Sequence, residues 1–143
     1  MAYTQGMNFI AAIILMNVPN EVLACKIFSK VLEKNDWAKM YLCSTPKLFD
    51  LSQQLMVRIE NELPVLHSHL FEYQVFLEVL LASPLMTLFS NMLNFQESTH
   101  IMNLFILDGE KFIMDLIMNV YKNMTPEVLK LTDNFEIQAY MSK

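Results

Sequence analysis

Apolar residues in this chain recur about every three to four positions, which is the spacing of amphipathic helices. The segment after Asn20 is an example, because Asn20 follows Pro19 and has a side chain typical of a helix N-cap. Its expected apolar face consists of Leu23, Ile27, Phe28, Val31 and Leu32. Lys26 and Lys30 fall on the other side, so the pattern predicts a helix with one buried and one solvated face.

Two threonine-proline pairs predict further helix starts. Thr45-Pro46 and Thr125-Pro126 each combine a capping residue with a proline in the first helical turn, where the missing N–H has no partner to lose. The first pair precedes a clear apolar stripe, which consists of Leu48, Leu51, Leu55 and Ile59. We therefore expect a helix to begin at each pair.

Other prolines and one glycine divide the rest of the chain. Pro64 is expected to open a short helix, whereas Pro84 should start a new helix or kink the preceding one. Residues 75–82 are nearly all apolar and should be buried on most sides. Residues 96–107 predict another helix, which Gly109 separates from a further apolar stripe. That stripe consists of Phe112, Ile113, Leu116, Ile117 and Val120.

The whole pattern predicts an all-α protein. Strand-type alternation is rare, and the chain contains only two glycines. Counting the starts and stops gives roughly seven or eight helices and no convincing strand. Helices with one apolar face bury it against one another, so we expect a multi-helix fold built by helix-on-helix packing.

The composition is strongly apolar and mildly acidic. Hydrophobic residues make up 54% of the chain and charged residues 17%, so it must bury most of its apolar surface or present an apolar face to a partner. The net charge of −5 argues against a nucleic-acid-binding protein and against a polybasic membrane anchor. The most apolar run, residues 9–16, is far shorter than the about 20 residues of a transmembrane helix. We expect a cytoplasmic protein without a transmembrane segment.

The cysteines and histidines form no pattern typical of a metal site. Cys25 and Cys43 are well separated, and each is expected to be a small buried apolar residue in a reducing compartment. His67 and His69 are two positions apart, which places them on different faces of a helix. No third ligand accompanies them, so we expect no metal site.

Three blocks of sequence indicate a known family. Residues 3–11 read YTQGMNFIA, residues 62–70 read ELPVLHSHL, and residues 101–112 read IMNLFILDGEKF. In order and approximate spacing they resemble the Tyr-x-Gln-Gly-Met, Leu-Pro-x-Leu-x-x-His-Leu and Ile-Trp-Asp-x-Phe-x-x-Glu-Gly blocks of the TBC family. That family accelerates GTP hydrolysis on Rab-type small GTPases. The resemblance is clearest over residues 3–122, and it implies that residues 1–143 are a partial Rab-GAP TBC domain.

The chain departs from the family pattern at several positions. Met102 and Asn103 stand where the family usually has tryptophan and aspartate, and Leu85 replaces another common tryptophan. The family's arginine finger belongs to an Ile-x-x-Asp-x-x-Arg motif some tens of residues before the glutamine motif. The one arginine of this chain, Arg58, has no such context. We therefore expect the N-terminal third of the domain to be missing and this chain to be a weak or inactive accelerator.

The resemblance implies a role for the first block. Gln5 would be the glutamine finger that orients the hydrolytic water on a Rab-type GTPase, while Tyr3, Gly6 and Met7 would support its loop. The chain would need no cofactor of its own, because GTP and magnesium belong to the partner. Such a protein would regulate vesicle trafficking and would reach endomembranes through the GTPase.

Two other interpretations remain open from the sequence. The chain could be a non-catalytic, truncated TBC module that docks on a GTPase or on another helical partner. More remotely, it could be an unrelated helical bundle with a chance match. Without the N-terminal third of the domain, the isolated chain is also expected to expose apolar surface that this third would cover, and therefore to aggregate or to pair.

Overall fold

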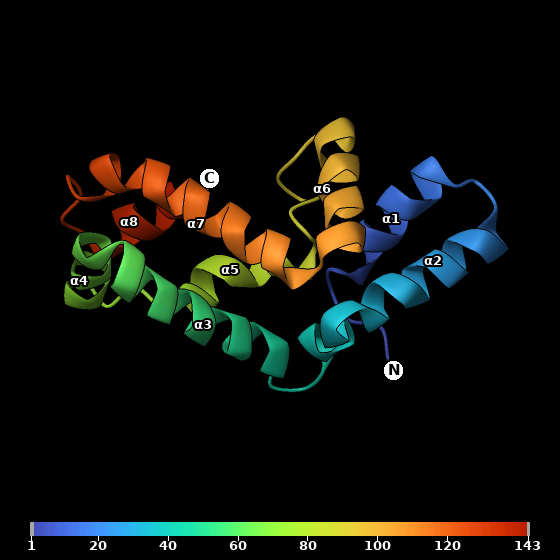
Figure 1. The fold of residues 1–143 in the computed structure, drawn as a ribbon, viewed down its shortest axis with the longest axis horizontal. Coiled ribbons are helices and arrows are strands. Elements are labelled where there is room, and N and C mark those ends of the chain that lie inside the picture. The colour runs from blue at the N-terminus through green and yellow to red at the C-terminus, as the bar shows by residue number, and fades with distance from the viewer. Residues whose placement is uncertain (1, 143) are drawn as a thin grey trace.

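The computed structural model describes residues 2–142. Over this range the chain forms eight α-helices and one 3-10 segment, η1, with no strand (Figure 1). The elements are α1 (Met7–Asn17), α2 (Glu21–Glu33), η1 (Lys34–Tyr41), α3 (Pro46–Glu62), α4 (Pro64–Glu72), α5 (Leu77–Met86), α6 (Phe95–Asp108), α7 (Glu110–Val128) and α8 (Asn134–Met141). The prediction of an all-α fold with seven or eight helices is confirmed.

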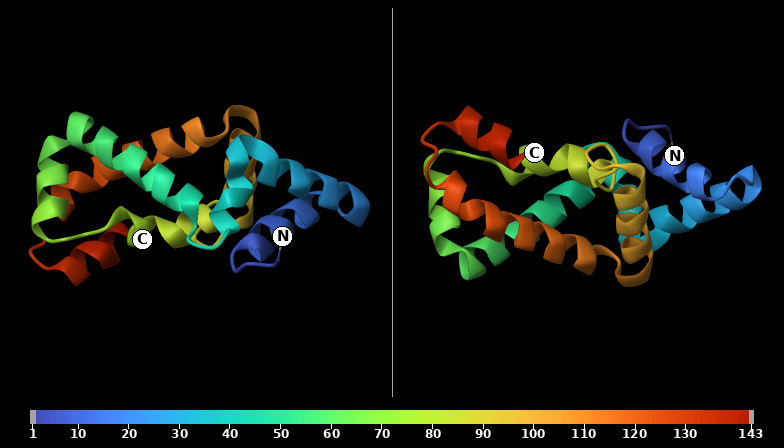
Figure 2. Two further views of the ribbon diagram at one scale, coloured as in Figure 1. Left: turned by 90° about the horizontal axis from the view of Figure 1, so that it is seen from below. Right: turned by 90° about the horizontal axis from the view of Figure 1, so that it is seen from above.

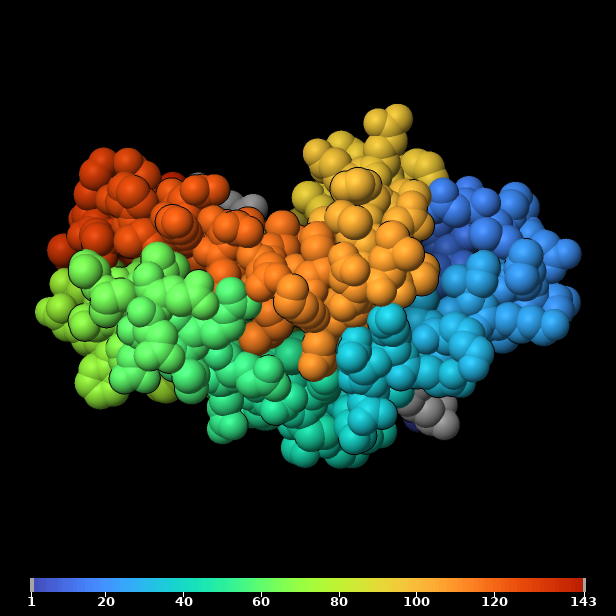
Figure 3. All heavy atoms as spheres, in the orientation of Figure 1, coloured from blue at the N-terminus to red at the C-terminus, as the bar shows by residue number. Residues whose placement is uncertain are grey.

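The helices form two parts that meet at η1 and α6. At one end α1 and α2 pack side by side, joined by a short loop (Figure 1). In the other part α3 packs against α5 and α7, while α4 and α8 lie at the far end (Figure 2). Helix α6 stands between the parts and contacts both α1 and α7. Figure 3 shows the result as an elongated molecule with a notch between α6 and the α7–α8 region.

The core runs through both parts. The predicted stripe of α3 is confirmed, because Leu48, Leu51, Leu55 and Ile59 are all buried. At the junction Trp37 of η1 is fully buried and meets Phe105 of α6 edge to face, with ring centroids 4.8 Å apart. Aromatic pairs in this geometry stabilise a core beyond their buried area. The junction is therefore a packed part of one core.

Several predicted helix starts are confirmed. The Asn20 side chain accepts a hydrogen bond from the Leu23 amide at 2.9 Å, and Pro64 is the first residue of α4. Pro46 likewise begins α3, but the capping role predicted for Thr45 is wrong, since its side chain makes no capping bond. Thr45 has a φ of 43°, in the left-handed region, whereas a capping residue usually has extended backbone angles.

The second threonine-proline prediction is wrong. Helix α7 continues through Pro126 to Val128, and the Thr125 hydroxyl donates to the Tyr121 carbonyl at 2.7 Å. Pro126 has no N–H to donate to the carbonyl one turn before it, but the helix continues for only two residues beyond Pro126. The last helix instead begins after Asp133, whose side chain accepts from two backbone amides of its first turn. Pro84 also starts no helix, because it lies inside α5.

The predicted buried faces are only partly correct. Leu23 in α2 and Val120 in α7 are 49% and 44% exposed, and Phe76 and Val79, in the apolar run, are each 61% exposed. The buried rows are rotated relative to the expected ones, because contacts with neighbouring helices choose which part of a wide apolar face is covered. In α7 the buried row consists of Ile113, Met114, Ile117, Met118 and Tyr121.

Both cysteines differ from their prediction. Cys25 and Cys43 are exposed, the first on α2 and the second in the loop before α3. Cysteine is usually buried, so the exposure of both side chains is set by where the fold places α2 and the loop before α3. No helix among residues 2–142 is both long and apolar enough to cross a bilayer.

Candidate functional site

The loop that precedes α1 carries Gln5 into solvent. Gln5 is exposed and occupies a turn directly before the helix. The Met7 amide donates to the Thr4 carbonyl at 3.2 Å, and the Phe9 amide donates to the Gly6 carbonyl at 3.2 Å. Among residues 2–142 the Gln5 side chain forms no hydrogen bond. Its amide group is therefore available to an external partner.

Gly6 is required by the path of this loop. It is buried and has a φ of 107°, a backbone angle that residues with a side chain rarely adopt. A Cβ atom on Gly6 would lie 2.8 Å from the carbonyl oxygen of Met86, at the end of α5. The residue after Gln5 thus lies directly against another helix, and only glycine fits there.

A chain of hydrogen bonds ties the same loop to η1 and α5. The Thr4 hydroxyl donates to the Tyr41 carbonyl at 3.1 Å. The Tyr41 hydroxyl in turn donates to the Met86 carbonyl at 2.6 Å. Burial raises the pKa of Tyr41 above its usual range, so its hydroxyl keeps its proton and remains a donor. The loop is held on both sides of Gln5.

The other predicted support residues lie around this turn. Met7 is buried, and its sulfur accepts from the Thr4 amide at 3.3 Å. Tyr3 is exposed, and its hydroxyl lies 3.3 Å from the Asn8 side-chain oxygen. The Gly6 amide donates to that same Asn8 oxygen, also at 3.3 Å. The structure thus brings Tyr3, Gly6 and Met7 together at the turn that carries Gln5.

Sequence reasoning missed Tyr41 and Met86. Both lie outside the three family blocks, at the ends of η1 and α5. They are 37 and 45 residues from their hydrogen-bond partners Thr4 and Tyr41, respectively. No local pattern links positions so far apart, so only the packed structure could identify them.

The one arginine of the chain, Arg58, is paired with two carboxylates of the chain itself. The Arg58 Nε donates to Glu62 at 2.9 Å, and its Nη1 donates to Asp115 of α7 at 2.8 Å. The two carboxylates raise the pKa of Arg58, first through these hydrogen bonds. Arg58 lies in the last turns of α3, near α4, whereas Gln5 precedes α1 at the other part of the molecule (Figure 1). The fold does not bring Arg58 to Gln5.

The histidines singled out earlier lie on α4 and are not clustered. The His69 ring nitrogen Nε2 lies 3.0 Å from the Leu131 carbonyl, which connects α4 to the loop before α8. Its ring also stacks at a tilt on Tyr73, with centroids 4.8 Å apart. Within residues 2–142 no group of three or more histidine, cysteine or acidic side chains forms a candidate metal site.

Comparison with known proteins gives a consistent result. A family model described as the Rab-GTPase-TBC domain matches residues 1–129. The Drosophila melanogaster ecotropic viral integration site 5 ortholog is 29% identical over 81% of this chain and 14% of its own length. TBC1 domain family member 2A of Homo sapiens is 26% identical over 97% of this chain and 15% of its own length.

A third relative extends the match over almost the whole chain. TBC1 domain family member 12 of Xenopus tropicalis is 25% identical over 99% of this chain and 20% of its own length. The chain thus spans between 14% and 20% of the length of these three relatives. Their length outside the match is far greater than the matched part.

Proposed function

The chain belongs to the Rab-GTPase-TBC domain family, and on that basis we propose that it acts on Rab-type small GTPases as part of a GTPase-activating module, with Gln5 as the water-orienting residue. The observation that carries this proposal is the exposed Gln5 at the tip of a turn whose neighbours on both sides are held. GTP and magnesium would come with the partner. Association with endomembranes, and a role in vesicle trafficking, would follow from the bound GTPase.

The chemistry of GTP hydrolysis suits a glutamine at this place. The reaction needs a water held in line with the γ-phosphate. A glutamine side chain offers one carbonyl acceptor and two N–H donors, so it can accept from that water while donating to the phosphoryl oxygens or the partner's backbone. It does this without a charge that would have to be desolvated.

The held loop contributes by reducing the entropy lost when the site forms. Thr4 binds the Tyr41 carbonyl, and Gly6 packs against Met86, so the backbone of the turn is set before any partner arrives. Only the few torsions of the Gln5 side chain remain to be ordered. Pre-ordered groups contribute more to a transition state than mobile ones, because less conformational freedom is lost on binding.

This chain by itself should have low activity, because it offers no free arginine to the GTPase. An arginine finger accelerates hydrolysis by about 10³- to 10⁵-fold, which corresponds to about 4–7 kcal/mol. Arg58 is the one arginine in the chain, and it is engaged with Glu62 and Asp115. Gln5 alone offers no positive charge to the phosphoryl oxygens, on which negative charge develops in the transition state. The chain should therefore bind GTPases but accelerate their GTP hydrolysis only weakly.

The experiment uses the 143-residue chain with a panel of Rab-type GTPases. Single-turnover GTP hydrolysis measures acceleration, and binding to the GDP–aluminium fluoride form of each GTPase measures affinity for a transition-state mimic. We expect weak acceleration of at least one GTPase and tighter binding to the aluminium fluoride form than to the GDP form. Gln5→Ala should abolish both effects. Gln53→Ala, an exposed glutamine on α3, is the matched control and should change neither.

One alternative function is tested by the same assay. The pairing of Arg58 with Glu62 and Asp115 also fits a non-catalytic docking module, which needs no arginine free to reach the GTPase. In that case the chain would bind a GTPase equally well in its GDP and aluminium fluoride forms, and Gln5→Ala would leave binding unchanged. Failure to bind any member of the panel would contradict both functions. Strong acceleration by the unmodified chain would contradict the argument about the missing positive charge.

A further inference from the structure

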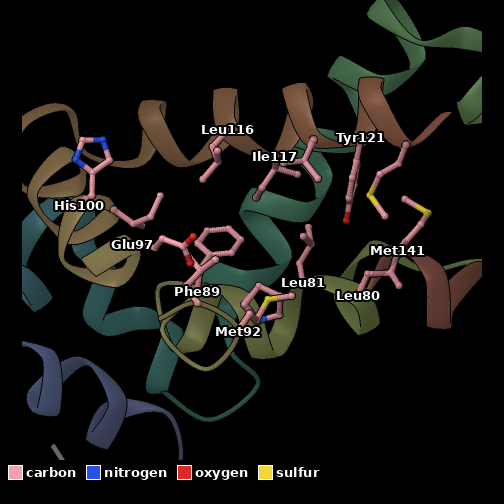
Figure 4. Close-up of a pocket in the computed structure, with 15 residues that line it drawn as sticks. Leu80, Leu81, Phe89, Met92, Glu97, His100, Leu116, Ile117, Tyr121 and Met141 are labelled. Atoms are coloured by element: carbon pink, nitrogen blue, oxygen red, sulfur yellow. The ribbon is translucent and has the colours of Figure 1, made fainter. Parts of the chain in front are cut away.

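A second candidate site lies away from the Gln5 loop, among α5, α6, α7 and α8. It is a cavity of about 410 Å³ lined by 15 residues (Figure 4). Exposed side chains of α6, namely Glu97 and His100, stand at one end of the cavity. Met141 of α8, which is buried, lies at the other end, and Ile117 of α7 lies between the two ends (Figure 4). The cavity therefore runs from α6 toward α8. It is open to solvent along part of its length, because Met92 and Val120, which also line it, are 38% and 44% exposed.

The walls of the cavity are almost entirely apolar. Leu81 of α5 faces Ile117 of α7 across the space, and Phe89 faces Leu116 (Figure 4). Small-molecule pockets in proteins commonly have volumes of about 300–1,000 Å³ and walls of this kind. An engineered apolar cavity of about 150 Å³ stays dry and binds benzene. The cavity here is larger and open to solvent at its rim, so an apolar ligand would displace water from apolar walls, which favours binding.

One polar group projects into this apolar space. Tyr121 of α7 is only 4% exposed, and in Figure 4 its hydroxyl points from α7 across the cavity toward Leu81. Among residues 2–142 this hydroxyl has no hydrogen-bond partner. In the part of the chain that the structure describes, the buried side-chain atoms that lack a partner are Trp37 Nε1 and Ser52 Oγ, so the Tyr121 oxygen is still reachable by water from the cavity. A tyrosine hydroxyl can both donate and accept. The cavity thus combines apolar walls with one hydrogen-bonding group that no protein atom of the described chain pairs.

We propose that this cavity binds an uncharged, largely apolar small molecule with one hydroxyl or carbonyl oxygen, which pairs with the Tyr121 hydroxyl. Apolar walls would cover the body of the ligand. A charged group among the apolar walls beside Tyr121 would lose water contacts without gaining a counter-charge, so anions and cations are disfavoured there. At the opening the Glu97 carboxylate, which accepts from the Asn94 amide in the cap of α6, further disfavours an acid.

The test uses a matched pair of probes, 2-naphthol and naphthalene, which differ by one hydroxyl. Binding to the 143-residue chain is followed by NMR of ¹³C-labelled methionine methyl groups, because Met124 and Met141 line the cavity. We expect both probes to shift these two methyl resonances, and 2-naphthol to bind more tightly. A net hydrogen bond predicts a difference of about 2- to 13-fold in affinity.

Tyr121→Phe separates the hydrogen bond from the shape of the cavity. We expect it to remove the preference for 2-naphthol while leaving the affinity for naphthalene unchanged. The variant should melt at about the same temperature as the unmodified chain, because the hydroxyl that it removes bonds to no protein atom among residues 2–142. Tyr140→Phe, on α8 and outside the cavity lining, is the matched control and should preserve the preference.

A second variant tests whether the probes occupy this cavity. Val120 lines the cavity and is partly exposed, so Val120→Trp should fill the space and abolish binding of both probes. Val57→Trp, on an exposed part of α3, is the control and should leave binding intact. If Val120→Trp melts early, Val120→Phe is used in its place. Three results would overturn the proposal. The first is that neither probe shifts the methyl resonances of Met124 and Met141. The second is that the Val120 and Val57 variants bind the probes alike, and the third is that Tyr121→Phe still prefers 2-naphthol.

Discussion

At the scale of single residues, the loop that carries Gln5 depends on the absence of one side chain. Gly6→Ala would place a Cβ atom against the Met86 carbonyl at a φ of 107°. Strained backbone of this kind costs about 1–3 kcal/mol. We expect urea unfolding of the variant to show a loss in that range. Ser29→Ala, which is exposed on α2 and adds no atom, should show none. An unchanged unfolding midpoint for Gly6→Ala would mean that the loop can move aside.

Tyr41 makes a second residue-scale prediction. Tyr41→Phe removes the donor to the Met86 carbonyl and leaves a partly buried oxygen without that partner, which should cost toward the lower end of about 1–3 kcal/mol. Tyr3→Phe removes an exposed hydrogen bond and should change the free energy of unfolding far less. Urea unfolding measures both. Equal effects of the two substitutions would contradict the idea that Tyr41 holds the loop.

The same tyrosine predicts how stability depends on pH. Burial raises the pKa of Tyr41 in the folded chain, whereas an unfolded tyrosine titrates near about pH 10. Below that pH both states keep the proton, so the contribution is constant. Above it the unfolded state loses its proton first, and stability falls as pH rises. Urea unfolding between neutral pH and about pH 11 should therefore fall less steeply for Tyr41→Phe than for the unmodified chain.

At the scale of helices, two ion pairs connect α7 with α3, and they should differ in strength. Arg58 meets Asp115 where both side chains are partly exposed, whereas Lys47 is buried and pairs with Glu110 at the start of α7. Arg58→Met should cost at most about 1 kcal/mol. Glu110→Gln strands a buried ammonium group, so its cost should lie toward the lower end of about 3–5 kcal/mol.

Salt distinguishes the two pairs. At about 1 M salt the Debye length falls to about 3 Å, which screens exposed charges but not buried ones. The effect of Arg58→Met on the free energy of unfolding should shrink in salt, while that of Glu110→Gln should persist. Urea unfolding at low and high salt measures this. If both effects vanish in salt, the Lys47 pair is not shielded from solvent.

Helix boundaries were predictable where local chemistry decides them. Asn20 and Pro64 act on the adjacent turn, so their signals in the sequence survive in the structure. The Thr125-Pro126 prediction was wrong because α7 packs along its length and tolerates a proline near its end. The rotation of the buried row, which left Val120 exposed, has the same origin. Periodicity identifies an apolar face, but neighbouring helices decide which part of it is covered.

At the scale of the whole molecule, what could be predicted divides by distance along the chain. Gln5, Gly6 and Met7 were identified because they form one continuous motif. Tyr41 and Met86 were not, since they reach the loop only through folding. The cavity around Tyr121 was also beyond prediction, because four helices must pack before a space exists between them. The structure also explains why the motif has a glycine at position 6: the end of α5 lies directly against it and leaves no room for a side chain.

The surface of the folded chain predicts association. Phe71 at the end of α4 and Phe135 at the start of α8 are 81% and 79% exposed. Asn134 donates to the Tyr73 and Gln74 carbonyls, which brings these two helix ends together. Exposed aromatic side chains gathered in one region favour contact with another apolar surface. We therefore expect the chain to associate as its concentration rises.

Light scattering coupled to size-exclusion chromatography, over a range of concentrations, measures that association. Phe71→Ser combined with Phe135→Ser should shift the chain toward the monomer, because it removes the two most exposed aromatic side chains without opening the core. Gln53→Ser on α3 changes no apolar area and should leave the distribution unchanged. A sharp monomer peak at every concentration, together with no binding of a dye specific for apolar surface, would show that these side chains are tolerated in water. The apolar composition of the chain would then be accounted for by its core alone.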